Sequence, residues 1–369
     1  MKDPAVEKEG GKDPMSIFNE MAKYGYEQLV FANDEASGLH AIIAIHDTTL
    51  GPALGGCRMW PYESEEDAII DALRLARGMT YKTAAAGLDL GGGKAVIIGD
   101  PRKDKTETLL RAFGRFVETL KGRYITAEDV GICAEDVEII RMETQHVVGL
   151  PRGPGAGGDP SPVTAYGVIC GMRACLERVY GDGSLKGRSV AVQGVGNVGY
   201  CIVKHLSEGG AKVYVTDVFK EKIDRVVEDF GVLPVLPEEI YDIDCDVFCP
   251  CALGGVINAK TVTRLKCKIV AGSANNQLAD ECHGDALHDL GILYAPDYII
   301  NAGGVINVSE EICGYDREKA MGKAAWIYHR IKAVMDIAEE GGIPTHQAAS
   351  LLAEERIAKI GRIHRIFVP

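Results

Sequence analysis

Over the first 148 residues, the spacing of apolar positions switches between the two-residue period of a strand and the period of about 3.6 residues of a helix. Apolar runs at 28–31 and 41–45 flank a polar segment at 33–38 and predict a pair of strands. Ser64 and Asp67 form a capping signal, and the apolar residues that follow recur at helical spacing, which predicts a helix from about 65 to Gly87. The pattern then predicts a strand at 95–98, a helix at 106–120 and a strand at 123–126.

A segment rich in glycine and proline, residues 149–162, predicts a boundary between two domains. Beyond it, short apolar runs alternate with helical patterns, which is typical of a parallel, doubly wound sheet. The expected strands are 190–193, 212–216, 247–251, 268–271 and 292–295, and the expected helices are 198–209 and 220–229. Ala353, Ile357 and Ile360 lie at helical spacing and predict a final amphipathic helix.

We therefore expect an α/β protein with two domains. The expected parts are a flexible charged tail at 1–14, a first domain at 15–148, a second domain at 149–342, and a C-terminal helix at 343–369 that packs back on the first domain.

Composition and charge narrow the classes of partner. The net charge of the 369-residue chain is -13, which argues against nucleic acid or an anionic membrane surface as a partner. The sequence has no run of eighteen apolar residues and no apolar core near its N-terminus, so neither a membrane span nor a secretory signal is expected. The eleven cysteines cannot all pair within one chain, and they indicate reduced thiols and a cytoplasmic location.

Three of these cysteines lie close together in the sequence. Cys245, Cys249 and Cys251 lack a CxxC pair and a neighbouring histidine. They are therefore interpreted as buried residues at a strand end, and no metal site is expected.

A dinucleotide fingerprint follows the first strand of the second domain. Gly194-Val195-Gly196-Asn197-Val198-Gly199 matches GxGxxG, with a predicted strand before it and a predicted helix after it. In this setting the glycines permit a tight turn, close approach of a diphosphate and close packing of helix on strand. Asp217 ends the next strand, where a carboxylate accepts hydrogen bonds from ribose hydroxyls and repels a 2′-phosphate. The cofactor is therefore expected to be NAD.

Two lysines and one aspartate are candidates for chemistry. Lys82 lies on the predicted helix, and Lys94 follows three glycines that we interpret as backbone approached by a substrate. Desolvation and mutual repulsion would lower the pKa values of two such lysines, although two ordinary surface lysines fit the spacing equally well. Asp129 follows a strand end and is interpreted either as a helix cap or as a proton carrier beside the lysines.

Several longer motifs resemble the glutamate/leucine/phenylalanine/valine dehydrogenase family from about residue 15 to the C-terminus. They are Gly51-Pro52-Ala53-Leu54-Gly55-Gly56-Cys57-Arg58-Met59-Trp60, Gly91–Lys94, Thr126–Gly131, Pro160–Ala165 and Asn301–Val308. The resemblance implies an oligomerisation and substrate domain, a Rossmann-like NAD-binding domain and an active-site cleft between them. It also implies a homo-oligomer, with an octamer expected. Cys57 departs from the family, in which a threonine is expected at that position.

The resemblance also implies roles for individual residues. Lys82 resembles the lysine that binds the substrate carboxylate, Lys94 the base that activates water, and Asp129 the proton-relaying aspartate. Asn275 resembles an asparagine near both cofactor and substrate, and Thr164 a threonine that contacts the nicotinamide carboxamide.

The expected substrate is a branched-chain amino acid. The resemblance places the substrate side chain against an apolar wall with these members: Leu54, Gly55, Ala127, Val305 and Val308. A buried carboxylate without a partner there would cost several kcal/mol, which argues against glutamate. We expect oxidative deamination of L-leucine, and also of valine and isoleucine, because Thr126–Asp129 looks closer to the leucine branch of the family than to the phenylalanine branch. A phenylalanine or valine enzyme, and a catalytically silent NAD-binding sensor, stay as alternatives.

Overall fold

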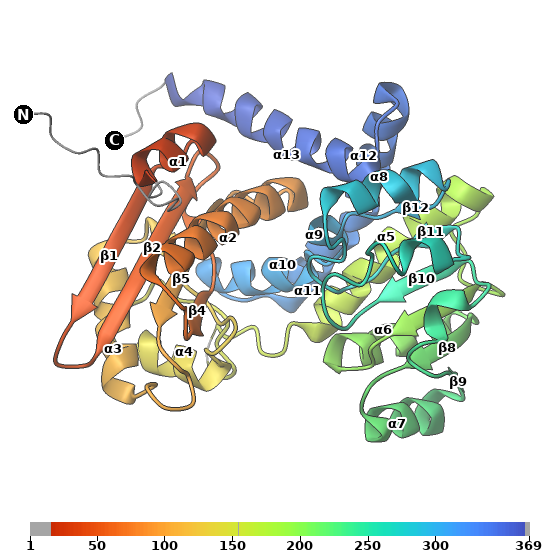
Figure 1. The fold of residues 1–369 in the computed structure, drawn as a ribbon, viewed down its shortest axis with the longest axis horizontal. Helices are drawn as coiled ribbons and strands as arrows, with labels where there is room; N and C mark the ends of the chain where they lie inside the picture. The colour runs from red at the N-terminus through yellow and green to blue at the C-terminus, as the bar shows by residue number, and fades with distance from the viewer. Residues whose placement is uncertain (1–15, 154, 366–369) are drawn as a thin grey trace, which may run out of the picture.

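The computed structural model describes residues 16–153 and 155–365 as two α/β domains, each built on a six-stranded sheet (Figure 1). The tail predicted at 1–14 lies outside the described residues. The first domain contains α1 (Ile17–Tyr24), β1 (Gln28–Asp34), β2 (Leu39–Asp47), β3 (Ala53–Leu54), β4 (Cys57–Trp60), α2 (Glu65–Ala86), β5 (Gly91–Ile98), α3 (Glu107–Thr119), β6 (Tyr124–Ile125) and α4 (Ala134–Arg141).

The second domain follows the same alternation of strands and helices over a longer stretch of chain. Its first elements are α5 (Ser161–Tyr180), β7 (Ser189–Gln193), α6 (Asn197–Glu208), β8 (Lys212–Thr216), α7 (Lys220–Phe230), β9 (Leu233–Pro234), β10 (Val247–Pro250), β11 (Ile269–Val270), α8 (Glu281–Asp289) and β12 (Leu293–Tyr294). The helices after them are α9 (Asp297–Ile300), α10 (Gly303–Ser309), α11 (Arg317–Ala325), α12 (Ile327–Gly341) and α13 (Thr345–Gly361). Short 3₁₀ helices lie at Ile240–Asp242, Val262–Arg264, Glu310–Cys313 and Arg362–Arg365.

The first sheet is mixed and buried on both faces. Its order is β1-β2-β5-β3-β6, with β4 also paired to β5. The two-residue period of β2 sends Ile43 and Ile45 into the core under α3, and Ile42 and Ala44 into the core under α2. The antiparallel β1–β2 pair confirms the predicted strand pair.

The helix α2 begins and ends where the sequence indicates. The Ser64 side chain accepts a hydrogen bond from the backbone N–H of Asp67, and Gly87 ends the helix in the left-handed conformation at φ 80°. The local cap and stop signals therefore fix the length of the helix that carries Lys82.

The second sheet confirms the predicted doubly wound fold. All its strands are parallel, in the order β12-β11-β10-β7-β8-β9. The strand order reverses between β7 and β10, so the glycine-rich turn after β7 lies at the point where such folds bind ligands.

The helices α1, α4, α5 and α8 to α12 were not expected from the sequence. In α5, more than half of the residues are buried, because α6, α10, α11 and α12 all pack against it. A helix that is apolar on most faces lacks the one-sided stripe that identifies a surface helix. The predicted boundary segment 149–162 also overlaps the start of α5, since Pro160 and Pro162 fit the first turn of a helix.

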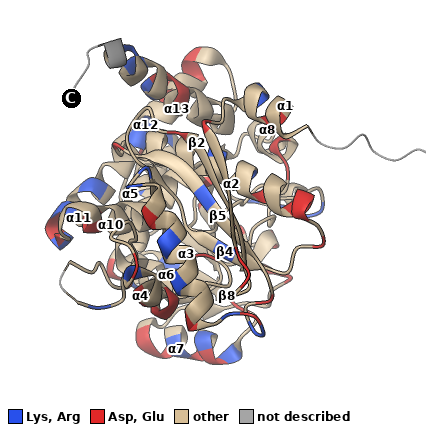
Figure 2. Ribbon diagram, turned by 90° about the vertical axis from the view of Figure 1, so that its left-hand side faces the viewer, with Lys and Arg blue, Asp and Glu red and all other residues tan. Residues whose placement is uncertain are grey.

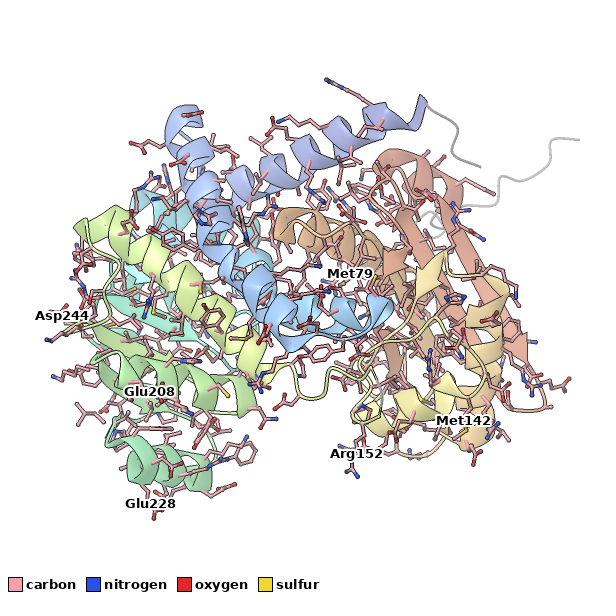
Figure 3. All side chains as sticks on the ribbon, turned by 180° about the vertical axis from the view of Figure 1, so that it is seen from behind. Met79, Met142, Arg152, Glu208, Glu228 and Asp244 are labelled. Carbon is pink, nitrogen blue, oxygen red and sulfur yellow. The ribbon has the colours of Figure 1, made fainter. Side chains whose placement is uncertain are left out.

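The C-terminal helix α13 crosses from the second domain back to α2 (Figure 1). Arg356 donates a hydrogen bond of 2.6 Å to the carbonyl of Leu88, just after α2, and forms an ion pair with Asp89. Met79 on α2 lies beside the junction of the domains (Figure 3) and packs against a core cluster that includes residues of both. The domains therefore share apolar contacts as well as a covalent link.

Charged residues are mixed rather than segregated on the outer helices. Figure 2 shows basic and acidic positions interspersed along α7 and α11. Among the described residues, no helix has the length and apolar character needed to cross a membrane.

Candidate active site

Lys94 lies in the interior of the first domain. It belongs to β5 and pairs in register with Ala44 of β2, and its side chain is only 6% exposed. Its Nζ lies 3.0 Å from Oδ1 of Asp129. Burial lowers the pKa of Lys94, although the nearby carboxylate opposes that shift. The reading of Lys94 as an ordinary surface lysine is wrong.

The glycines before Lys94 are required by close packing. A Cβ on Gly92 would lie 2.1 Å from the backbone nitrogen of Thr80, and one on Gly93 would meet the ring of Tyr124 at 2.8 Å. These contacts come from α2 and β6, so the glycines allow helix and strands to pack closely on β5. The interpretation of this run as backbone approached by a substrate stays a prediction.

Asp129 is held by two cations, one on each carboxylate oxygen. Lys94 contacts Oδ1, and Arg58 donates from Nε to Oδ2 at 2.8 Å. Burial alone would raise the pKa of Asp129, but the charges of Lys94 and Arg58 outweigh it and hold the pKa below its usual value. The carboxylate is thus ionised and fixed in orientation.

Lys82 lies at the junction of the two domains. Its Nζ donates to Oδ1 of Asn275 at 3.4 Å, and Asn301 donates to the same oxygen at 2.9 Å. Asn276, next in the chain, adopts the left-handed conformation at φ 50°, which asparagine tolerates better than most residues. Burial, with a smaller contribution from Lys94, lowers the pKa of Lys82 to about 8, against the opposing effect of Asp297.

Asp297 is a buried carboxylate that sequence reasoning missed. It accepts hydrogen bonds from the backbone N–H groups of Gln277 and Tyr298 at 2.9 and 2.7 Å. Burial nevertheless raises its pKa above the usual value. No local motif marks this residue, because its partners are brought to it by the fold.

The expected apolar wall forms one continuous part of the core. Leu54 is fully buried, Ala127 and Val305 are buried, and Val308 packs against the same cluster. A Cβ on Gly55 would lie 1.7 Å from the carbonyl oxygen of Gly93, so this glycine is required by the approach of β3 to β5. Within this set the structure presents no charged side chain.

The glycine-rich turn has the geometry of a diphosphate cradle. Gly194 adopts φ 96°, and a Cβ on Gly199 would meet the carbonyl oxygen of Gly194 at 2.1 Å. A Cβ on Gly196 would meet nothing within 4 Å, so its backbone is open to a ligand. Val195, Asn197 and Val198 continue this turn into α6, whose N-terminus favours anions. The residues present therefore fit a dinucleotide.

Asp217 lies beside the same turn. Its Oδ2 accepts from the backbone N–H of Val195 at 2.8 Å, and its Oδ1 accepts from that of Phe219 at 3.0 Å. Lys222 and Arg225, which the sequence analysis missed, line a cavity with Val195, Gly196 and Asn197.

Thr164 is a buried residue near the start of α5. Its hydroxyl donates to the carbonyl of Pro160 at 2.9 Å, and a Cβ on Gly304 would lie 3.3 Å from its Oγ1. Thr164 is therefore adjacent to α10, the helix that carries Val305 and Val308.

The connecting segment between the domains is tied to the second domain by one carboxylate. Glu311 accepts hydrogen bonds from the backbone N–H groups of Gly149, Leu150 and Gly157 at 2.8, 3.2 and 2.7 Å. Arg152 lies in this segment (Figure 3). Sequence reasoning did not identify Glu311, because its partners are about 160 residues away.

The expectation for the three neighbouring cysteines can be compared with their positions. Cys245 and Cys249 are buried at β10, and the Sγ atoms of Cys249 and Cys251 lie 3.5 Å apart. Among the residues that the structure describes, no cluster of three or more side chains could hold a metal ion. Cys57 is also fully buried, and burial raises its pKa.

Comparison with known proteins gives consistent matches over both domains. Residues 27–146 match a family described as Glu/Leu/Phe/Val dehydrogenase, dimerisation domain, and residues 157–219 and 216–364 match one described as Glutamate/Leucine/Phenylalanine/Valine dehydrogenase. The chain is 60% identical over 354 residues to a leucine dehydrogenase of Thermoactinomyces intermedius, covering 96% of this chain and 97% of that protein. It is 59% identical to a leucine dehydrogenase of Bacillus subtilis (strain 168) over 354 residues, again 96% of this chain and 97% of that protein.

A solved structure agrees with the fold. The L-tryptophan dehydrogenase of Nostoc punctiforme superposes with a TM-score of 0.86 at 47% sequence identity, covering 94% of this chain and 99% of that chain.

Proposed function

Because the chain belongs to the glutamate/leucine/phenylalanine/valine dehydrogenase family, we propose that it catalyses the reversible NAD-dependent oxidative deamination of L-leucine, and also of valine and isoleucine. The observation that carries the proposal is the buried Lys94–Asp129 pair, with Lys82 at the domain junction and an apolar wall nearby. The products are the 2-oxo acid, ammonia and NADH.

Substrate recognition follows from the charges available. Lys82 supplies a positive charge for the substrate carboxylate, and Asn275 holds the Lys82 amine in place. The side chain of the substrate meets Leu54 and Val305, which offer no cation to a second carboxylate. The wall therefore supports an aliphatic amino acid and disfavours glutamate.

The chemistry divides among three side chains. The glycine-rich turn would hold NAD, which would supply the acceptor for a hydride from the Cα of the substrate. Asp129 takes up a proton from the substrate amino group, which the ionised state of its carboxylate permits. Lys94, whose pKa is lowered by burial, then takes a proton from the water that attacks the imine carbon, and the adduct separates into 2-oxo acid and ammonia.

Cofactor binding uses the second domain. The open backbone at Gly196 would hold the diphosphate, Asp217 would accept hydrogen bonds from the ribose hydroxyls, and Thr164 and Asn275 would contact the nicotinamide. The negative charge of Asp217 disfavours the 2′-phosphate of NADP.

The matched dimerisation domain makes the protein a homo-oligomer, and we propose an octamer. Phe31 on the edge strand β1 and Phe18 on α1 are both more than half exposed, which supports burial against other copies of the first domain. Light scattering should give about 320 kDa, eight times the 39.7 kDa of one chain. All eleven cysteines are free, which supports a reducing cytoplasmic location.

The proposal is tested by initial rates of NADH formation at alkaline pH. L-leucine, L-valine, L-isoleucine, L-phenylalanine and L-glutamate are compared, each with NAD and with NADP. A leucine-first ranking with NAD supports the proposal. A phenylalanine-first ranking would agree with the roles of the lysines but overturn the assignment of the apolar wall to a branched-chain substrate. NAD binding without any turnover would favour a catalytically silent sensor.

A further inference from the structure

Arg58 binds the carboxylate oxygen of Asp129 that Lys94 does not contact. Arg58 projects from β4 and makes two ion pairs, one with Asp129 through Nε at 2.8 Å and one with Asp71 through Nη1 at 2.9 Å. Its side chain is 22% exposed, so both contacts are largely removed from solvent. Arg58 therefore connects the candidate proton carrier to α2.

The backbone around Arg58 is fixed on both sides. The N–H of Cys57 donates to the carbonyl of Ala127 at 2.8 Å, and the N–H of Met59 donates to that of Val130 at 2.9 Å. These two bonds attach β4 to the loop that carries Asp129. Arg58 and Asp129 are thus presented to each other by a rigid ladder rather than by a flexible surface contact.

The far end of the guanidinium is anchored as well. Asp71 receives hydrogen bonds from the Tyr62 hydroxyl at 2.8 Å and from Arg74 at 2.9 Å. Asp71 therefore accepts from three donors, Arg58 among them, and holds Arg58 in one orientation, which in turn fixes Oδ2 of Asp129.

We propose that Arg58 is a positioning residue for the deamination reaction, which locks the Asp129 carboxylate and places a second positive charge beside Lys94. This inference rests on the proposed function. Because Lys94 and Arg58 bind opposite oxygens of one carboxylate, loss of Arg58 would free that carboxylate to rotate away from the substrate amine and from Lys94.

The charge of Arg58 also has a consequence for proton transfer. Arg58 lowers the pKa of both Lys94 and Asp129, since a nearby positive charge disfavours a protonated amine and favours a carboxylate. Removing the charge should raise both pKa values. Lys94 must be neutral and Asp129 ionised to act, so the acid limb of the pH profile should move to higher pH.

The other titratable groups that interact with Lys94 or Asp129 are Cys57 on β4, Tyr62 after β4, Tyr124 on β6, Lys82 on α2, and Glu128. Asp71 interacts with Arg58, and Asp136 with Cys57. Of these, Cys57 and Tyr124 are fully buried, and burial raises both of their pKa values, so they stay neutral.

The test compares pH profiles of kcat and kcat/KM for L-leucine in the wild type, Arg58→Gln and Arg58→Lys. In Arg58→Gln we expect the acid limb to rise by about one pH unit and kcat at neutral pH to fall at least tenfold. KM for L-leucine should change less than threefold, because Lys82 is untouched. In Arg58→Lys the acid limb should move by no more than half as much as in Arg58→Gln, because lysine keeps the positive charge.

Arg74→Gln is the matched control. It removes an ion pair from the same Asp71, but Arg74 is 65% exposed and does not reach Asp129. Its acid limb should coincide with that of the wild type. An acid limb in Arg58→Gln that coincides with the wild type, in a variant of unchanged melting temperature, would overturn the inference. A wild type without turnover on any amino acid would instead refute the proposed function.

Should Arg58→Gln fail to fold, Asp71→Asn offers a second route, because it loosens the anchor and leaves Arg58 in place. Asp71→Asn should then lower kcat, and the pH of its acid limb should stay close to that of the wild type. An unaltered kcat in Asp71→Asn would show that the anchor does not position Asp129.

Discussion

Substitution of Lys82 by methionine tests how the substrate carboxylate is held. Methionine keeps an unbranched side chain of similar length and removes the charge. In the free protein the pKa of Lys82 is about 8 rather than 10.5, which corresponds to about 3 kcal/mol of unfavourable free energy for the charged amine. A bound carboxylate relieves much of this cost, because it supplies the counter-charge that Lys82 lacks.

Lys82 is only half-buried, so solvent screening reduces its contribution. We expect Lys82→Met to lose about 2–3 kcal/mol of transition-state binding, or about 30–150-fold in kcat/KM for L-leucine. Lys103→Met, on an exposed turn, is the control and should leave kcat/KM unchanged.

A substrate without a carboxylate provides a second test in the same assay. L-leucinamide lacks the carboxylate, so its kcat/KM should fall much less than that of L-leucine when Lys82 is replaced. Equal losses for both substrates, or a loss below threefold for L-leucine, would refute the assignment of Lys82 to the carboxylate.

The pH dependence of KM has a definite sign. Lys82 binds a carboxylate in its protonated form, and that form is lost as pH rises through about 8 in the free protein. KM for L-leucine should therefore rise above that pH in the wild type. In Lys82→Met this rise should be absent, whereas a persisting rise would assign the titration to another group.

The remaining predictions concern the proton carrier, the cofactor, the connecting segment and the packing of β5. Asp129→Asn should lower kcat by about 10²–10⁴-fold in initial-rate assays, since the amide cannot take up a proton, and a loss below tenfold would contradict that role. Asp217→Ser should weaken NAD binding and lower the ratio of kcat/KM with NAD to kcat/KM with NADP at least tenfold. An unchanged ratio would show that Asp217 does not select the cofactor. Glu311→Gln should increase tryptic cleavage at Arg152, because one acceptor for the segment's N–H groups is lost, and equal cleavage would show that the segment is held by other contacts. Gly92→Ala should lower the free energy of unfolding in urea by about 2 kcal/mol or more, because the new Cβ would lie 2.1 Å from a backbone nitrogen of α2; an unchanged midpoint would contradict the packing argument.

Local signals in the sequence account for much of the fold. The cap at Ser64 and the stop at Gly87 delimit α2, because both act through bonds within a few residues. The glycine fingerprint places a tight turn after β7 for the same reason, since Gly194 adopts a conformation at φ 96° that a side chain on any other residue would hinder. By contrast, α5 is buried on most of its faces, so it carries no amphipathic stripe from which its boundaries could be read.

The candidate site required information that no short segment contains. The sequence alone left Lys94 and Lys82 open to a reading as surface lysines. Their environments depend on β5 pairing with β2 and on α2 meeting Asn275, which is 193 residues further along the chain. Arg58 lay within a recognised motif, yet only the register between β4 and the loop at 127–130 brings it to Asp129.

What the sequence by itself determined was therefore the class of fold, the cofactor turn and a short set of candidate side chains, whose roles came from the resemblance to a family. The fold class and the turn follow from backbone preferences, which are properties of neighbouring residues. The tertiary structure decided which charges meet, how deeply they are buried and which pKa values they consequently have. Electrostatic interactions depend on distance and desolvation, and both are fixed only when strands and helices from separate parts of the chain pack together.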